Sequence, residues 1–147
     1  MEVGDRFPDV ELGRGSGGTV RTGALLASGP AVLYFYPRDL TPGCTREAHD
    51  FQEHLRQFAD RGVGVYGVST DDAASHARFA DQCHLEFPLL VDAGGALARQ
   101  LGILDEGRGM ARRTTYLVAQ DGRIRRIWHA VKVDGHAAEV LAAAAQA

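Results

Sequence analysis

The sequence has few cysteines, no long apolar run and no marked excess of either charge, and each shortage excludes a class of protein. Two cysteines in 147 residues are too few for a secreted disulfide scaffold, and a chain of this length can bury a core without one. No stretch approaches the roughly 18 to 20 consecutive apolar residues that a membrane-spanning helix needs. With 16 basic and 19 acidic residues mixed along the chain, no strongly positive region is available for nucleic acid or an anionic membrane.

What remains is the composition of one globular domain. At 147 residues, 45% of them hydrophobic, the chain is long enough for one core and too short for two ordinary domains, so we expect a single domain over residues 1–147. The polar first residues and the lack of a long apolar run favour a cytoplasmic protein that binds neither membranes nor nucleic acid. If the two cysteines of such a protein pair, we expect the pairing to be chemical rather than structural.

The hydrophobic pattern alternates between strands and helices. Residues 31–36 (AVLYFY) form a continuous apolar run, which is typical of a central strand covered on both faces, and residues 63–70 form a second one. From Cys44 onward the apolar residues fall at positions 44, 48, 51, 55 and 58, which predicts one helical face that begins at the cysteine and continues to residue 58. This order predicts an α/β sandwich around one mixed sheet.

The other expected elements follow along the chain. They are a loose hairpin over 10–22, a helix capped by Asp71 and Asp72 with Cys83 on its inner face, a short strand at 88–91, a helix at 96–101, a glycine-rich loop over 102–110, a strand hairpin over 115–130 and an alanine-rich helix over 134–146.

Cys44 comes directly after the central strand, at a predicted helix start. A cysteine is a good nucleophile only as its thiolate, and the unpaired N–H groups and positive dipole end of a first helical turn favour that anion. Thr41 offers a hydroxyl three residues earlier, Gly43 lets the backbone approach a ligand closely, and Pro37 closes the pocket on the strand side. Tyr36 is as readily a core residue as a pocket wall. The stretch therefore predicts a reactive thiol beside an oxyanion site.

Pro37, Thr41 and Cys44 match the motif Pro-x-x-x-Thr-x-x-Cys of peroxiredoxins, and the sequence resembles that family along nearly its whole length. The resemblance implies a thioredoxin-like fold and a thiol peroxidase that reduces hydrogen peroxide or organic hydroperoxides at Cys44, through a sulfenic acid. It implies no metal, haem or flavin, electrons drawn from thioredoxin or a similar thiol, and a monomer or simple homodimer. The sequence is most similar to the bacterioferritin-comigratory, or Q-type, subgroup, through residues 36–37, 41–45, 47–48, 87–90 and 131–136.

The resemblance also implies roles for side chains outside the motif. In the family an arginine from a distant strand completes the site, and Arg113 occupies the matching place. Its neighbour Arg112 should point to the opposite side, because side chains alternate along a strand. Arg113 would align the peroxide together with Thr41 and the backbone N–H of Cys44, and it would stabilise charge on the leaving oxygen. Glu47, one turn into the helix, would orient this arginine. We count as substrate-binding residues Tyr36, Gly43 and Glu47.

The resemblance leaves the second half of the reaction open. Many Q-type members carry a resolving cysteine five residues after the peroxidatic one, but this sequence has His49 there. The other thiol is Cys83, and a branch of the subgroup places its resolving cysteine on the same helix, at the position that is Ala80 here. Either Cys83 closes an intramolecular disulfide, which we favour, or it is a core thiol and an external thiol resolves Cys44.

Three other classes fit only part of the sequence. A metal site is disfavoured because the chain has no Cys-x-x-Cys or His-x3-His pair among residues of the right types, which are Cys44, His49, Cys83 and His84. A dithiol oxidoreductase of the thioredoxin kind would need cysteine at position 47, which is glutamate. A peroxide sensor or chaperone-like module could use the same fold and thiol, and oxidation without turnover would identify it.

Overall fold

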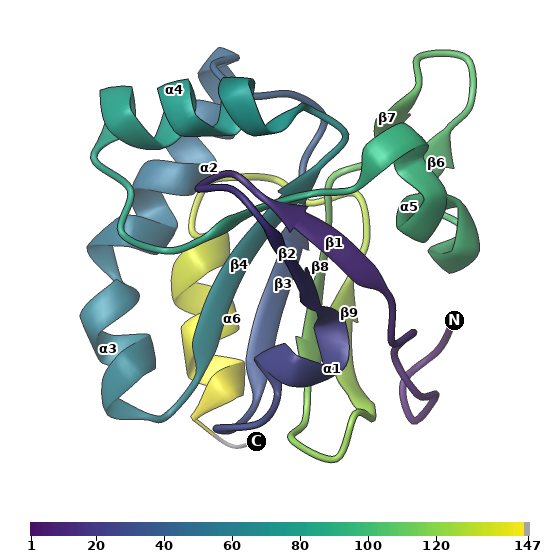
Figure 1. Ribbon diagram of the computed structural model, residues 1–147. Helices are drawn as coiled ribbons and strands as arrows, with labels where there is room; N and C mark the ends of the chain where they lie inside the picture. The colour runs from purple at the N-terminus through teal and green to yellow at the C-terminus, as the bar shows by residue number, and fades with distance from the viewer. Residues whose placement is uncertain (146–147) are drawn as a thin grey trace.

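Seven strands form one mixed sheet in the computed structural model, which describes residues 1–145 (Figure 1). The strand order is β2-β1-β5-β4-β3-β8-β9. The strands β3, β4 and β5 run parallel to one another, while β1, β2, β8 and β9 pair in antiparallel fashion with their neighbours. The predicted mixed sheet is therefore confirmed. The bounds are β1 (Glu11–Arg14), β2 (Thr19–Arg21), β3 (Ala31–Phe35), β4 (Gly64–Ser69), β5 (Leu89–Val91), β8 (Thr114–Val118) and β9 (Ile124–Trp128).

The strand β3 lies in the interior of the sheet, between β4 and β8, because both of its faces are apolar. All five of its residues are buried, and it pairs with β4 on one side and β8 on the other. Its β-branched and aromatic residues fit a pleated surface that is covered on both faces. Because β3 and β4 are parallel, the chain must cross over between them, and α2 (Pro42–Glu53) with α3 (Leu55–Asp60) provides the crossover. The loop that follows β3 therefore leads directly into α2.

Helices cover both faces of the sheet (Figure 1). The helices α2, α3, α4 (Ala73–Cys83) and α6 (His136–Ala144) pack on one face. The short helix α1 (Thr22–Leu25) and α5 (Ala96–Leu101), which follows the 3₁₀ turn η1 (Ala93–Gly95), contribute to the core on the other. Within residues 1–145, no helix combines the length and the apolar character needed to cross a bilayer.

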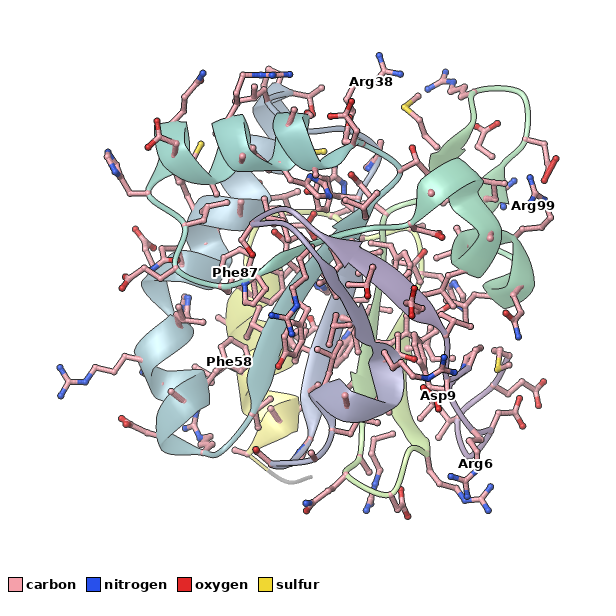
Figure 2. All side chains as sticks on the ribbon, in the orientation of Figure 1. Arg6, Asp9, Arg38, Phe58, Phe87 and Arg99 are labelled. Atoms are coloured by element: carbon pink, nitrogen blue, oxygen red, sulfur yellow. The ribbon has the colours of Figure 1, made fainter. Side chains whose placement is uncertain are left out.

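Each face of the sheet has its own apolar core. Side chains alternate along β3, so Tyr34 belongs to the core under α2, α3, α4 and α6, whereas Leu33 belongs to the core under α1 and α5. We call these the helical core and the opposite core. Phe58 and Phe87, labelled in Figure 2, are both buried in the helical core. Cys44 also lies in the helical core, so the candidate site is built on that face.

The predicted helix that begins at Cys44 differs from the structure at both ends. The helix α2 begins two residues earlier, at Pro42, because proline's fixed φ suits the first helical turn. The helical face predicted to continue to residue 58 is interrupted at His54, where φ is −98° and ψ is 2°. The ring Nδ1 of His54 lies 2.8 Å from the carbonyl oxygen of Asp50 and competes for the acceptor that a continuing helix would use.

In the second half of the chain, one predicted element differs from the structure and another extends beyond the described residues. The glycine-rich loop predicted over 102–110 contains a small hairpin of β6 (Leu104–Asp105) and β7 (Met110–Ala111). Its side chains Leu104 and Ala111 are buried in the opposite core, so tertiary packing rather than strand propensity determines it. The last predicted helix is observed as α6, and position 146, where it was expected to end, lies outside the described residues.

Candidate active site

Cys44 lies in the first turn of α2 and is 1% exposed. Thr41 is the N-cap residue and has an extended backbone, with φ −81° and ψ 153°. The amides of the first helical turn have no partner within the helix, so those of Gly43 and Cys44 are available to a bound anion. The fold thus places a thiol beside free backbone donors at the positive end of a helix of 12 residues.

Arg113 directly precedes β8, the strand that pairs with β3, and its side chain reaches the sulfur. Its Nη2 lies 3.4 Å from the Sγ of Cys44. A Cβ added at Gly43 would come within 3.3 Å of the same nitrogen, so glycine leaves room for the guanidinium. The neighbouring Arg112 is exposed, and its backbone N–H donates to the carbonyl of Ile103. Of the two arginines considered from the sequence, Arg113 is the one that contacts the thiol.

Glu47 holds the arginine in place. The Nη1 of Arg113 donates to Oε1 of Glu47 at 2.6 Å, and the glutamate is 1% exposed. Burial raises the pKa of Glu47 to about 7, although the nearby guanidinium opposes that rise. Burial acts to lower the pKa of Arg113, but the charges of Glu47 and Cys44 outweigh it and leave that pKa raised. One guanidinium therefore bridges a buried carboxylate and the sulfur.

Two residues predicted to bind substrate are placed differently. Tyr36 is fully buried, and its hydroxyl donates to Oδ1 of Asp39 at 2.6 Å, so it is a core residue rather than a pocket wall. Glu47 is also buried, and its contact with Arg113 is that of a residue that orients the arginine rather than one that binds substrate. The alternation of strand side chains carries Tyr36 inward with Tyr34, in the helical core.

The other residues considered from this stretch of the sequence are Pro37, Arg38, Thr41 and His49. The hydroxyl of Thr41 donates to the carbonyl of Arg38 at 3.0 Å and does not cap α2. Pro37 is half-buried and lies two residues after the end of β3, where proline cannot continue the strand pairing. Arg38 is exposed and projects outward (Figure 2). His49, at the position of the expected local resolving cysteine, is exposed on α2.

Cys83 is the last residue of α4, and both cysteines are free thiols. It is half-buried and packs against the helical core that contains Cys44. Burial raises the pKa of the Cys83 thiol. His84 follows in a left-handed conformation with φ 53°, which ends the helix. The structure therefore places Cys83 at a helix end, on the border of the same core as Cys44.

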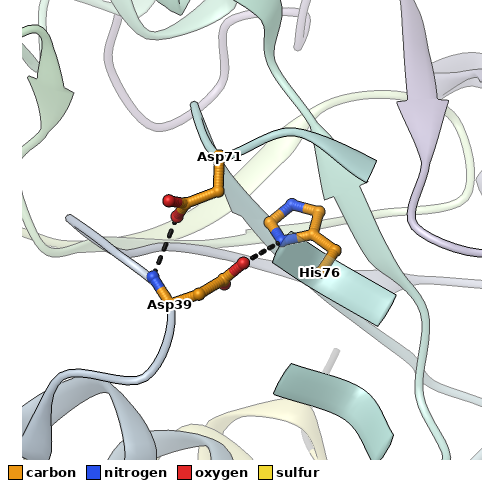
Figure 3. A group of neighbouring side chains, drawn as sticks. All are labelled: Asp39, Asp71 and His76. Carbon is orange, nitrogen blue, oxygen red and sulfur yellow. Dashed lines mark hydrogen bonds and ion pairs between the residues drawn. The ribbon is translucent and has the colours of Figure 1, made fainter. Parts of the chain in front are cut away.

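A polar cluster that no sequence motif indicated lies behind the loop that precedes Cys44. Asp39, Asp71 and His76 bring one potential ligand atom each to within 4.8 Å of one another (Figure 3). Both ring nitrogens of His76 already lie 2.7 to 2.8 Å from protein oxygens, so the cluster fits a hydrogen-bonded network better than a metal site. No local signal identifies Asp39, because a lone aspartate in a loop is ordinarily exposed.

Comparisons with known proteins agree with this geometry. Residues 3–127 match the AhpC/TSA family. Peroxiredoxin Bcp of Bacillus subtilis is 40% identical over 103 residues, which cover 70% of this chain and 65% of the relative. The crystal structure of peroxidoxin BcpB from Mycobacterium tuberculosis superposes with a TM-score of 0.92 at 36% identity, covering 98% of this chain and 96% of that one.

A second solved structure is similar over the same range. The bacterioferritin comigratory protein of Xanthomonas campestris has a TM-score of 0.88 at 35% identity, covering 98% of this chain and 95% of that chain. The thioredoxin-like fold expected from the sequence is thereby confirmed. The chain belongs to the AhpC/TSA family and is a peroxiredoxin similar to the Bcp and Q-type proteins, a thiol-dependent peroxidase.

Proposed function

We propose that Cys44 is the peroxidatic cysteine of this enzyme and that it reduces hydrogen peroxide or organic hydroperoxides. The observation that carries the proposal is the 3.4 Å contact between Nη2 of Arg113 and the sulfur, at the start of a helix. A guanidinium so close to the sulfur stabilises the thiolate. The Xanthomonas relative is described by its alkyl peroxide reduction activity, which supports organic hydroperoxides as a substrate class.

The first step transfers one oxygen atom. The thiolate attacks the near oxygen of the peroxide, the O–O bond breaks, and the far oxygen leaves with the bonding pair and takes a proton to become water or an alcohol. Cys44 is thereby oxidised to the sulfenic acid. Arg113, the amides of Gly43 and Cys44, and the hydroxyl of Thr41 are the groups we assign to aligning the peroxide and to stabilising the leaving oxygen.

The second step, in our proposal, uses Cys83, because His49 replaces the local resolving cysteine. The Cys83 thiolate attacks the sulfenic sulfur, the S–O bond breaks as the disulfide forms, and the hydroxide leaves and takes a proton to become water. Cys83 is at the end of α4, where helices fray most readily, and this position supports its movement toward Cys44. Its partial burial and raised pKa favour instead a core thiol, in which case an external thiol attacks Cys44.

We also propose a reductant, a compartment and an oligomeric state for the enzyme. A dithiol reductant such as thioredoxin would reduce the disulfide through a mixed disulfide and return both thiols. We place the reaction in the cytoplasm, where thiols are kept reduced, and we expect a monomer or simple homodimer. No metal or organic cofactor enters any step.

Peroxide treatment followed by non-reducing mass analysis tests this proposal. Wild type should lose two hydrogens and yield a peptide that joins Cys44 to Cys83, whereas Cys83→Ser should gain one oxygen at Cys44. Full turnover with thioredoxin in Cys83→Ser, with sulfenic acid persisting until the reductant is added, would replace the two-cysteine cycle by external resolution. Peroxide consumption by Cys44→Ser at the wild-type rate would overturn the assignment of the peroxidatic thiol.

A further inference from the structure

We propose that Asp39 and His76 are positioning residues that clamp the loop before Cys44 in the conformation that reacts with peroxide. We call residues 37–41, between β3 and α2, the active-site loop. The inference rests on the proposed function in one respect, that Cys44 is the reacting thiol. It does not depend on which thiol resolves the sulfenic acid.

Asp39 is the inward-facing anchor of the active-site loop. Leu40, which follows it, is 41% exposed, whereas Asp39 is 6% exposed. Its carboxylate meets three side chains: the hydroxyl of Tyr36 donates to Oδ1 at 2.6 Å, the hydroxyl of Ser75 donates to Oδ2 at 2.8 Å, and Nδ1 of His76 lies 2.7 Å from Oδ2. Three partners on one carboxylate hold it in a fixed place.

His76 connects this anchor to the sheet. Its Nδ1 faces the Asp39 carboxylate, and its Nε2 lies 2.8 Å from the carbonyl oxygen of Leu90 in β5 (Figure 3). Both partners are acceptors, so both ring nitrogens carry hydrogen when both bonds are made, and the ring is then an imidazolium. Burial alone lowers the pKa of His76, but the hydrogen bond and charge of Asp39, with smaller contributions from Leu90 and Asp71, leave it raised.

The active-site loop is also tied through its main chain. The backbone N–H of Asp39 donates to Oδ2 of Asp71 at 2.8 Å, as Figure 3 shows. The same oxygen accepts the hydroxyl of Ser69 at 2.6 Å, at the end of β4. The loop is thus attached to β4, to the start of α4 and, through His76, to β5.

The attachment matters because the next residue is strained. Leu40 has φ 63°, in the left-handed region that a branched side chain rarely adopts. Such a conformation persists only when the surrounding contacts determine it, and the bonds to Asp39 are those contacts on one side. The direction of the chain at Leu40 sets where Thr41 and the first amides of α2 lie. A buried ion pair is a weak source of stability but a strong geometric constraint, which fits this role.

The test is the rate constant for oxidation of Cys44 by hydrogen peroxide in the full chain. It is measured by rapid quenching and mass analysis in a Cys83→Ser background, so that the first step is observed alone. We expect Asp39→Asn to lower this rate constant by at least about tenfold, because displacements of about 1 Å can reduce rates by up to about 10²-fold. The substitution removes no group that touches the peroxide.

A matched pair at His76 separates positioning from packing. The amide nitrogen of His76→Asn can replace Nδ1 and donate to Asp39, whereas that of His76→Gln can replace Nε2 and donate to Leu90. If the bond to Asp39 positions the loop, the asparagine variant retains more of the rate than the glutamine variant. This order also carries the test if Asp39→Asn fails to fold.

Controls from the opposite core separate positioning from a general loss of stability. Ile124→Val and Leu101→Ala should lower the unfolding free energy and leave the rate constant within about twofold of the parent, since neither side chain lies in the helical core. A wild-type rate in Asp39→Asn, equal rates in the two His76 variants, or an equal loss in the controls would overturn the clamp. Failure of Cys44 to react in the parent would overturn the proposed function, and the clamp with it.

Discussion

In the opposite core, the buried polar side chains Asp92 and Thr22 bond to backbone groups, whereas on the side of the helical core charged side chains also pair with one another. Asp92 accepts the backbone N–H groups of Leu97 and Ala98, each at 2.9 Å, and so supports the start of α5. Thr22 donates to the carbonyl of Pro8 at 2.6 Å. Such bonds satisfy groups that any fold must satisfy. They require no particular chemistry near them.

The helical core contains ion pairs that no backbone group requires. Arg113 with Glu47 and His76 with Asp39 are buried or half-buried pairs. Of the described residues, the buried side-chain atoms without a hydrogen-bond partner are Oε2 of Glu47 and the hydroxyl of Tyr34, and both residues lie on this side of the sheet. Because desolvating charges is expensive, such groups cluster where function needs them. The buried polar groups of the opposite core therefore stabilise the fold, whereas those of the helical core support the proposed reaction of Cys44.

The largest effect on activity should come from removing the thiol itself. Cys44→Ser should abolish peroxidase turnover, because a hydroxyl at this position is a far weaker nucleophile than a thiolate. Peroxide consumption in a single turnover without reductant is the measurement, in which Cys83→Ser should react as wild type and so controls for loss of a thiol in general. Turnover above background in Cys44→Ser would show that the reacting group lies elsewhere.

The next largest effect should come from Arg113→Lys. One ammonium cannot bridge both the Cys44 sulfur and the Glu47 carboxylate as the guanidinium does, so charge alone should not restore function. We expect the rate constant for oxidation of Cys44 to fall by about 10²-fold. Arg112→Lys is the matched control on the exposed neighbour and should react as wild type. Equal rates in the two variants would contradict the role of Arg113.

A smaller effect should appear in the pH dependence of stability. The folded protein keeps the proton of Glu47 up to about pH 7, whereas the unfolded chain loses it near 4.5. Rising pH therefore favours the unfolded state, so the contribution of this group is complete below 4.5 and is lost as the pH rises through about 7. In Glu47→Gln this dependence should be absent.

Urea unfolding over a pH series provides the measurement. The difference in unfolding free energy between wild type and Glu47→Gln should change between about pH 4.5 and 7 and be flat on either side. Other titrating groups, His76 among them, are present in both proteins and cancel. A difference that is constant over the whole series would refute the buried, proton-binding state of Glu47.

The smallest effect should come from a substitution in the opposite core. Ile124→Val, in the opposite core, should lower the unfolding free energy by about 1 kcal/mol through the lost methylene group. Peroxidase turnover at 25 °C should be unchanged, because the substitution leaves every charged pair in place. Denaturant unfolding and steady-state turnover on the same preparation check both statements. A severalfold loss of turnover would mean that the two cores are not independent.

The elements that the sequence predicted well are those set by local signals. The apolar run at residues 31–36 became the central strand, and Asp72 caps α4 through Ser75 as its spacing indicates. The β6–β7 hairpin could not be predicted in the same way. Its strands have two residues each, and contacts such as that of Leu104 against Gly95 determine them.

In the candidate site, too, local signals identify some residues, whereas contacts with distant parts of the chain place the others. The positions of Thr41, Gly43 and Cys44 follow from one short stretch, and the choice of Arg113 over Arg112 followed from the family resemblance and strand alternation. The inward direction of Asp39 depends on His76, 37 residues later in the chain, and on Leu90 beyond it. The sequence left Tyr36 open between a core residue and a pocket wall, because nothing local distinguishes a buried tyrosine from one that lines a cavity.

The most direct test of the account is to locate the first oxygen atom that the protein accepts. Wild type, Cys44→Ser and Cys83→Ser are mixed with less than one equivalent of hydrogen peroxide in the presence of a sulfenic acid trap, and their peptides are analysed by mass. The account predicts the trapped sulfenic acid at Cys44 in Cys83→Ser, and no fast oxidation in Cys44→Ser. Fast formation of the adduct at Cys83 in Cys44→Ser would contradict it.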